Sequence, residues 1–310
     1  MELRARFDEQ NNINWAKVME DSGCKILYGV DDYKIHGKIV LITRRTHGRP
    51  QHMVNLSTGN YNESTARLYC DLSLFSADPV LCNDAVQFFR NMEIGNLYGS
   101  YRKLLVAPSS LKPGILNLIS QEMAKAAEGL PARIIMKMNS LTDKDIIDKL
   151  ISASQAGVKV DLIIRGICCL RPEVPGYTDN ITVRSIVGRF LEHARIFCFG
   201  EGEDTQYYIG SADMMTRNTE RRVEILTPVT EPRLCAQLRE LVQAQLKDNT
   251  KARFLHANGD YTRTVTEEEP FDSQIYLFEQ AYRQAENAAP PDKPLQKDFV
   301  LSGLRSLFKR

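Results

Sequence analysis

The sequence predicts a mixed α/β protein built from two copies of one α/β unit. The same order of helix, strand and turn patterns occurs twice along the 310 residues, and equivalent positions in the two runs keep a constant spacing. Each run also contains one histidine that is followed two positions later by a basic residue. A chain of this length usually forms two domains of about 150 residues each, which agrees with two copies.

The first copy begins with a helix pattern over residues 14–22, which stops at Gly23, a residue type that commonly ends helices. A second helix is expected to begin at Asp78-Pro79, because an acidic cap followed by proline is typical of helix starts. Strand patterns between these helices occupy residues 25–28, 39–43, 53–56 and 72–75.

The second copy opens with a helix pattern over residues 111–128 and a strand pattern over residues 132–138. A helix over residues 143–154 then stops before Gly157, and Glu231-Pro232 opens the last helix of the repeat. The remaining strand patterns lie at residues 158–164, 196–199, 206–209 and 223–226, with an insertion at about residues 167–192.

The spacing between equivalent positions indicates a duplication. Four pairs of residues are each 153 positions apart: Ser57 and Gly210, Asn60 and Asp213, Asp71 and Glu224, and Pro79 and Pro232. His36 and His193 are 157 positions apart, because the hairpin turn that follows the histidine differs in length between the copies. A constant offset across unlike elements is the mark of an internal repeat.

The duplication suggests how the chain divides. We expect a first unit at residues 1–106 and a second at residues 107–310. The first unit lacks the helix and strand that open the second, so we expect it to be incomplete at its N-terminus. After about residue 250 the sequence becomes polar, which predicts a peripheral tail.

Composition limits the kind of partner. Lys and Arg number 40 against 39 Asp and Glu, so the net charge is +1, and a generally basic surface for nucleic acid is excluded. The seven cysteines form no CxxC pair, which is typical of reduced thiols in the cytoplasm. No signal peptide or transmembrane segment is apparent. We therefore predict a cytoplasmic protein and leave peripheral membrane association open.

The two histidines are the strongest candidates for catalysis. His36 and Lys38 lie two positions apart on a predicted strand and therefore face the same side, as do His193 and Arg195. A neighbouring fixed cation disfavours the charged imidazole and keeps a neutral, nucleophilic nitrogen. Each strand is followed by a turn of small polar residues that can hold a ligand. Because duplicated folds often place their site between the copies, we expect one shared site.

Basic residues near strand ends point to phosphate as the ligand, because guanidinium and ammonium groups bind phosphate oxygens well. The basic residues concerned are Arg4, Arg6, Lys34, Lys38, Arg44, Arg45, Lys137, Arg165, Arg184 and Arg189. No P-loop, Rossmann glycine fingerprint or protein-kinase motif set occurs.

The His-x-Lys and His-x-Arg strands, each with its small-residue turn, resemble the phospholipase D superfamily. The resemblance implies two duplicated phospholipase D-like α/β/α sandwich domains with mixed sheets. The superfamily motif HxKxxxxD requires an aspartate where this chain has Thr43 and Gly200, which counts against phosphodiester hydrolysis.

A longer resemblance covers almost the whole chain. It is carried by Glu2–Glu9, Tyr33–Lys38, Ser57–Asn62, Ala66–Tyr69, Lys137–Leu141, Ile164–Pro172, Arg184–His193 and Tyr208–Asp213, which are similar to the C-terminal half of bacterial polyphosphate kinases of type 1. This resemblance implies reversible transfer of the ATP γ-phosphoryl group to the end of inorganic polyphosphate through a phosphohistidine. It also implies Mg²⁺ as cofactor, ATP or ADP and polyphosphate as partners, and homo-oligomers of the full-length proteins.

By motif match, His36 is the phosphorylated nucleophile, with Lys38 beside it, and His193 is the second catalytic histidine. Tyr69 and Arg165 match nucleotide-contacting positions. Arg6 matches a position assigned to magnesium, although guanidinium has no lone pair to give a metal, so we expect it to bind phosphate beside the ion. The remaining predicted phosphate-binding residues are Lys34, Asn60, Lys137 and Arg189.

Two alternatives stay open. One is a phospholipase D-like phosphodiesterase or nuclease. The other is a catalytically impaired fragment that binds polyphosphate, because the family's N-terminal domains are missing from this sequence and some nucleotide contacts would be lost with them.

Overall fold

The structure is a computed structural model that describes residues 9–263 and 267–287. The elements of the first half are α1 (Glu9–Asp21), β1 (Lys34–Ile35), β2 (Lys38–Thr46), β3 (Arg49–Ser57), α2 (Glu63–Ala66), β4 (Tyr69–Cys70), β5 (Ser73–Ser76) and α3 (Pro79–Glu93). Those up to the end of the second repeat are β6 (Leu105–Val106), α4 (Leu111–Ala127), β7 (Arg133–Met138), α5 (Lys144–Gln155), β8 (Lys159–Ile164), β9 (Ile181–Ile186), β10 (Leu191–Glu192), β11 (Arg195–Phe199), the 3₁₀ turn Gly202–Asp204, β12 (Gln206–Gly210), α6 (Thr216–Glu220), β13 (Arg222–Val223), β14 (Ile225–Val229) and α7 (Pro232–Lys247). β15 (Ala252–Leu255), β16 (Tyr261–Arg263) and α8 (Ser273–Asn287) follow.

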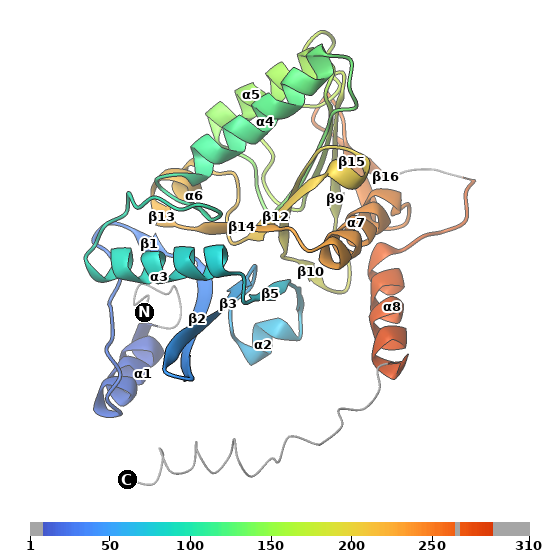
Figure 1. Cartoon of the computed structure of the whole chain (residues 1–310). Helices are drawn as coiled ribbons and strands as arrows, with labels where there is room; N and C mark the ends of the chain where they lie inside the picture. The colour runs from blue at the N-terminus through green and yellow to red at the C-terminus, as the bar shows by residue number, and fades with distance from the viewer. Residues whose placement is uncertain (1–8, 264–266, 288–310) are drawn as a thin grey trace.

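The second half is organised around a nine-stranded mixed sheet in the order β16-β15-β9-β8-β7-β11-β12-β14-β6. Its β7, β8 and β9 are parallel, whereas the flanking strands are antiparallel. Helices α4 and α5 cover one face and α7 covers the other (Figure 1). Because both faces are covered, strands such as β8 and β11 are buried along nearly their whole length.

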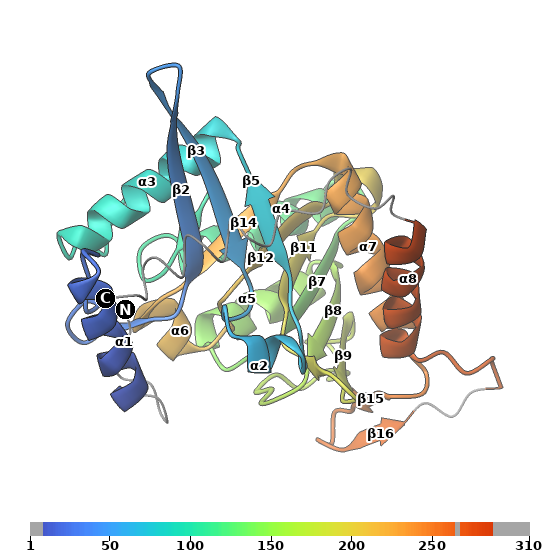
Figure 2. The same cartoon turned by 90° about the horizontal axis from the view of Figure 1, so that it is seen from below.

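The first half contains a smaller sheet in the order β2-β3-β5, and α3 packs against it through Leu81, Ala85 and Phe88. The long β2–β3 hairpin projects beyond the helices (Figure 2). Its two-residue turn is His47-Gly48, and both residues have positive φ, as a tight hairpin turn of this kind requires. The predicted mixed α/β fold with a duplicated unit is confirmed.

The duplication is preserved even at the starts of helices α3 and α7. The Asp78 carboxylate accepts a hydrogen bond from the backbone N–H of Leu81 at 2.8 Å, and Glu231 accepts one from Leu234 at 2.9 Å. The two capping bonds are therefore 153 positions apart, like the other repeated pairs. The same local structure has formed twice from the same local signals.

Three sequence predictions differ from the structure. Residues 25–28 form no strand. The predicted strand 223–226 is interrupted at Glu224, where the chain passes from pairing with β1 to pairing with β12. The residues after 250 are not all peripheral, because β15 joins the large sheet and Ser273 and Gln274 are buried. Polar composition misled the prediction, since these polar groups are satisfied inside the protein.

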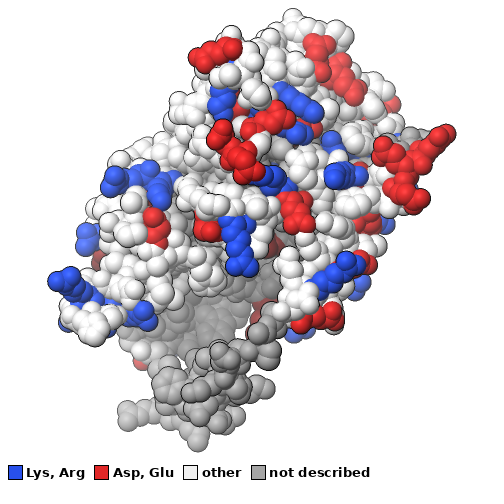
Figure 3. Space-filling model, turned by 45° about the vertical axis from the view of Figure 1, so that its right-hand side comes forward, with Lys and Arg blue, Asp and Glu red and all other residues white. Residues whose placement is uncertain are grey.

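The surface carries mixed charge. On the face in Figure 3, Lys and Arg side chains are interspersed with Asp and Glu. Within the described residues, no helix has the length and apolar character needed to span a bilayer.

Candidate active site

Two short parallel strand pairs join the copies and build the site. β1 pairs with β13, so that Ile35 lies opposite Val223, and β4 pairs with β10, so that Cys70 lies opposite Glu192. The backbone N–H of His36 donates to Val223 O at 2.9 Å. Each pair therefore delivers a histidine from one copy beside a carboxylate from the other.

The first histidine is fixed by Glu224. His36 Nδ1 lies 2.9 Å from Glu224 Oε2, and the Glu224 side chain is fully buried. Ser211 Oγ donates to the same carboxylate at 2.5 Å and Asn218 Nδ2 at 2.6 Å. Since an ionised carboxylate only accepts, His36 carries its proton on Nδ1 and leaves Nε2 with a lone pair.

The second histidine is fixed by Asp71 in the same manner. His193 Nδ1 lies 2.8 Å from Asp71 Oδ1, which also accepts from Thr58 Oγ1 at 2.6 Å. The Tyr69 ring packs on the imidazole with a centroid distance of 4.8 Å. The contact joins a predicted nucleotide-binding tyrosine to a predicted catalytic histidine.

Both histidines are held neutral. Burial lowers the pKa of His36 below its ordinary value of 6.5, although its hydrogen bond with Glu224 acts in the opposite direction. Burial likewise lowers the pKa of His193, against the opposing effect of Asp71. The sequence attributed the neutral imidazole to the neighbouring cation, but desolvation is the larger cause and Lys38 a smaller one.

Basic side chains surround the two rings. Lys38 Nζ donates to His36 O at 2.5 Å, and Arg195 Nη1 donates to His193 O at 2.7 Å. Burial lowers the pKa of Lys38 to about 8, and the charges that act on it include Glu224, Arg195 and Asp71. These charges come from both copies, so groups that contact each of the two histidines act on Lys38 together.

The other predicted residues lie in different settings. Arg165 donates from Nε to Glu192 O at 2.8 Å, next to His193. Lys34 lies on β1, directly before the loop of His36, and its register partner is Arg222. Asn60 is exposed in the turn after β3.

Two further predicted residues contact groups of the protein, and a third lies outside the described residues. Lys137 is 2% exposed and its ammonium contacts Glu192 and the carbonyl of Ala194, so it holds protein groups in this structure. Arg189 is exposed and lies over the Phe190 ring. Arg6, with its predicted place beside magnesium, lies outside the described residues.

Sequence reasoning did not include Asp71, Glu224 or Arg222 among the site residues. The signal for the two carboxylates was available, because they are one of the pairs separated by 153 positions. Arg222 Nη1 lies 3.9 Å from Glu224 Oε1 and adds a further cation. Thr43 Oγ1 lies 2.9 Å from His52 Nδ1 on the exposed hairpin, so the position where the phospholipase D motif has its first aspartate points away from the site.

A metal ion would find few protein ligands here. The described residues contain no group of three or more His, Cys, Asp and Glu side chains suited to a metal. The two carboxylates of the site are already occupied by histidine and hydroxyl donors.

Comparison with known proteins identifies the family. The family models for polyphosphate kinase C-terminal domain 1 and C-terminal domain 2 match residues 1–96 and 104–274. The polyphosphate kinase of Staphylococcus haemolyticus is 44% identical over 283 residues, which are 91% of this chain and 39% of that protein. That of Thermosynechococcus vestitus is 50% identical over 261 residues, or 84% of this chain and 36% of the relative.

Solved structures agree. The crystal structure of polyphosphate kinase from Porphyromonas gingivalis superposes with a TM-score of 0.84 at 36% identity, and the match covers 92% of this chain and 44% of that one. The phosphatidylserine synthase of Haemophilus influenzae, at 14% identity and a TM-score of 0.50, shares the fold. The chain spans about two fifths of the length of the curated relatives it matches. By these matches it belongs to the polyphosphate kinase family.

Proposed function

We propose that this chain carries the phosphotransfer site of a polyphosphate kinase, which moves the ATP γ-phosphoryl group reversibly to the end of inorganic polyphosphate through phosphorylated His36. The observation that supports this most is the state of His36. Its Nδ1 is tied to a buried carboxylate, its pKa is lowered by burial, and basic side chains surround it. These are the requirements for a nitrogen nucleophile that attacks a polyanion.

In the first step, Nε2 of His36 attacks the γ-phosphorus, a nitrogen–phosphorus bond forms, and the bond to the ADP oxygen breaks. Positive charge develops on the imidazole as it is phosphorylated, and the Glu224 carboxylate on Nδ1 stabilises this charge. In the second step, a terminal oxygen of polyphosphate attacks the same phosphorus and releases neutral His36. In the reverse direction, ADP is the attacking group.

The basic residues stabilise charge on the phosphoryl group during both steps. Lys38, Arg165 and Arg222 come from both copies and are all partly or fully buried, where their interaction with phosphate is stronger than in water. His193 is the second catalytic histidine, and its Nε2 is the nitrogen available to a phosphate oxygen. Tyr69, Lys34, Asn60 and Arg189 are proposed to contact nucleotide or polyphosphate.

Magnesium enters this proposal with the nucleotide. Mg²⁺ is usually held by substrate phosphates and water with only one or two carboxylates, which agrees with the small number of free protein ligands here. We therefore treat the ion as part of the ATP substrate and assign no step to it. Arg6 is proposed to bind the phosphates beside the ion. A cytoplasmic location and a homo-oligomeric state of the complete protein are part of the same proposal.

The test is incubation of the chain with γ-labelled ATP, followed by treatment with acid and with alkali. A phosphohistidine is stable to alkali and labile to acid, and its label should pass to added polyphosphate or to ADP. His36→Ala is expected to lower labelling by about 10⁴-fold or more, as for loss of a nucleophile. The control His47→Ala, at the exposed hairpin turn, should label as the wild type does.

Other results would favour the alternatives. Release of product from a phosphodiester by the wild type but not by His36→Ala would indicate a phospholipase D-like hydrolase. Polyphosphate binding that survives His36→Ala, with no phosphohistidine in the wild type, would indicate a binding module.

A further inference from the structure

The backbone around His193 is held by three cations. Glu192 O accepts from Arg165 Nε at 2.8 Å, and His193 O accepts from Arg195 Nη1 at 2.7 Å. Ala194 O accepts from Lys137 Nζ at 3.1 Å. Three successive carbonyls are thus each bound by a different basic side chain, so His193 cannot shift along its strand without breaking charged hydrogen bonds.

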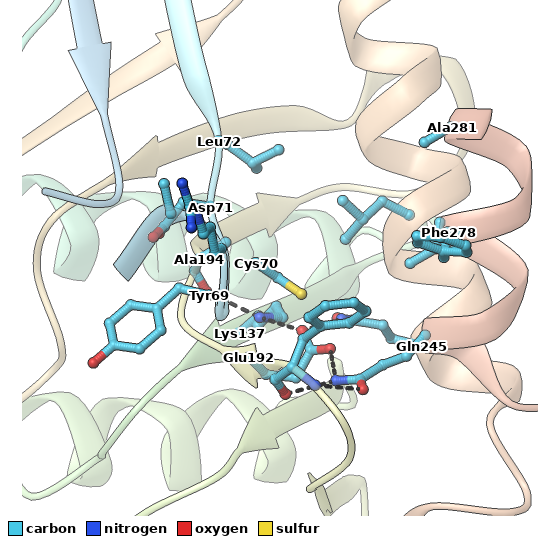
Figure 4. A pocket seen from close by; sticks show the side chains of 16 residues that line it. Tyr69, Cys70, Asp71, Leu72, Lys137, Glu192, Ala194, Gln245, Phe278 and Ala281 are labelled. Atoms are coloured by element: carbon cyan, nitrogen blue, oxygen red, sulfur yellow. Dashed lines mark hydrogen bonds and ion pairs between the residues drawn. The ribbon is translucent and has the colours of Figure 1, made fainter. Parts of the chain in front are cut away.

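The side chain of Glu192 lies at the centre of a buried network. Its Oε2 is 3.1 Å from Lys137 Nζ and accepts from Gln245 Nε2 at 2.6 Å, and its Oε1 accepts from Gln274 Nε2 at 2.7 Å. Figure 4 shows Lys137, Glu192 and Gln245 close together, with the Tyr69 ring pointing away from them. All four residues line a cavity of about 380 Å³. The ligands of Glu192 thus come from β7, α7 and α8.

The short strands of this region need such support. β10 and β4 contain two residues each, and beside this short ladder Leu191 N donates to Leu68 O at 2.9 Å and Ala194 N to Cys70 O at 2.8 Å. Yet β10 leads into His193 and β4 leads into Asp71. The relative position of these two strands sets the distance between the histidine and its carboxylate.

The first copy has apolar residues at positions equivalent to two members of the network. The positions equivalent to Glu192 and Gln245, by offsets of 157 and 153, are Ile35 and Met92. Both are apolar and pack in the same hydrophobic cluster. A buried ion pair is usually no more stabilising than well-packed apolar side chains. The polar version in the second copy therefore calls for an explanation other than stability.

The orientation of Gln245 supports this view. Because a carboxylate only accepts, Gln245 must present Nε2 to Glu192, and its Oε1 then accepts from no group among the described residues. Both oxygens of Glu192 are thereby bound by amide N–H donors, one from Gln245 and one from Gln274.

We propose that Glu192, held by Lys137, Gln245 and Gln274, is a positioning residue that fixes His193 against Asp71. The inference rests on the proposed function for its kinetic consequence only. Lys137 then serves the site through the Ala194 carbonyl and Glu192, as a positioning residue instead of the phosphate ligand that the sequence predicted.

The test replaces the network by its apolar counterpart in the triple variant Lys137→Met, Glu192→Ile, Gln245→Met. The variant should unfold in urea within a small margin of the wild type, since the first copy folds with Ile35 and Met92 at the positions equivalent to Glu192 and Gln245, and Lys137→Met removes the cation that would otherwise be left without its carboxylate partner. Its kcat is expected to fall by about 10-fold to 100-fold with KM for ATP nearly unchanged, because a small misplacement of a catalytic group has effects of this size. A neutral polar variant, Lys137→Met with Glu192→Gln, should recover part of kcat.

The second readout is independent of activity. The His193 ring is titrated by NMR and identified by comparison with His193→Gln. The charged and aromatic groups that face it are Asp71, Arg195, Arg165 and Tyr69. In the triple variant, the pKa of His193 should move upward toward 6.5 as the ring becomes more hydrated.

An unchanged kcat together with an unchanged His193 titration in the well-folded triple variant would overturn the proposal. If the wild type itself transfers no phosphoryl group, the proposed function fails, and the titration alone still decides whether Glu192 positions His193.

Discussion

The surroundings of His36 and His193 follow one plan with different degrees of burial. Each ring donates to a carboxylate of the opposite copy, and each carboxylate accepts from a hydroxyl, Ser211 in one case and Thr58 in the other. Glu224 is fully buried, whereas the Asp71 side chain is 22% exposed. The duplication accounts for the shared plan, and the difference in burial fits the different roles proposed for the two histidines.

The basic residues beside the two histidines, Lys38 and Arg195, differ in their carboxylate partners. Arg195 is bound by Asp213 at 3.2 Å, whereas in the described part of the chain Lys38 has no carboxylate within salt-bridge distance. Both basic side chains donate to the carbonyl of their own histidine, but only Arg195 is also bound by a carboxylate. This is the arrangement expected for a nucleophile on one side and a fixed partner on the other.

The largest expected effect separates the two carboxylates. Glu224→Gln should slow phosphorylation of His36 by about 10²-fold to 10³-fold, because the charge that stabilises the phosphorylated imidazole is lost. Asp71→Asn should slow it by about 10-fold, since His193 does not form the covalent bond. Single-turnover labelling with γ-labelled ATP measures both, and equal effects would show that the two histidines have equivalent roles.

The turns after β3 and β12 give a second contrast. A Cβ at Gly59 would lie 2.0 Å from Asp71 Oδ2, whereas the position 153 residues later, Ala212, already has a Cβ. Gly59→Ala should therefore displace Asp71 and lower kcat by about 10-fold, by misplacing His193. Ala212→Gly serves as the control and should stay within a few-fold of the wild type. Wild-type kcat in Gly59→Ala would mean that Asp71 is not needed in this position.

The pH dependence distinguishes Lys38 from Arg195. Because the pKa of His36 is lowered from 6.5, its neutral, nucleophilic form persists to lower pH than that of an ordinary histidine. On the acid side, kcat/KM should therefore fall only below pH 6.5. Lys38 loses its proton above its pKa of about 8, so kcat/KM should decline as the pH rises past this value. Lys38→Arg should remove the alkaline decline, and Arg195→Lys should leave it in place. A decline that persists in Lys38→Arg belongs to another group.

The smallest expected effect concerns the repeated helix caps. Asp78→Ala and Glu231→Ala should each lower the free energy of unfolding by about 1 kcal/mol, because each removes a side-chain bond to a helix N-terminus. Asp78 also pairs with Lys103 at 3.1 Å, so its effect should be slightly the larger. Urea denaturation followed by circular dichroism measures both. If one of the two variants unfolds with the free energy of the wild type, the two caps are not equivalent.

The sequence predicted the duplication and the main strands because local signals, such as caps, glycine stops and alternating apolar residues, occur in both copies. It also predicted that His36 and His193 share a site. It did not reveal that their carboxylates are exchanged, because β1, β4, β10 and β13 contain two residues each and produce no periodic pattern.

The contacts of Lys137 could not be predicted from the sequence for a similar reason. A lysine at the end of a strand suggested a phosphate ligand, but its partners depend on residues brought from far along the chain, among them Gln274 through Glu192. The polar composition after residue 250 suggested a peripheral tail, yet Gln274 in this segment reaches Glu192 beside His193. Such contacts depend on tertiary structure and leave no mark on sequence spacing.

Because each histidine is bound by a carboxylate of the other copy, a single unit cannot orient its own histidine. A single unit contains a histidine and a carboxylate that lie on different strand pairs, so neither can orient the other within that unit. The smallest entity in which both histidines are oriented is a pair of units, whether fused in one chain or associated as separate chains. Local unfolding of either unit would leave both histidines without orientation at once, so activity should be lost in one step even where the two halves melt separately.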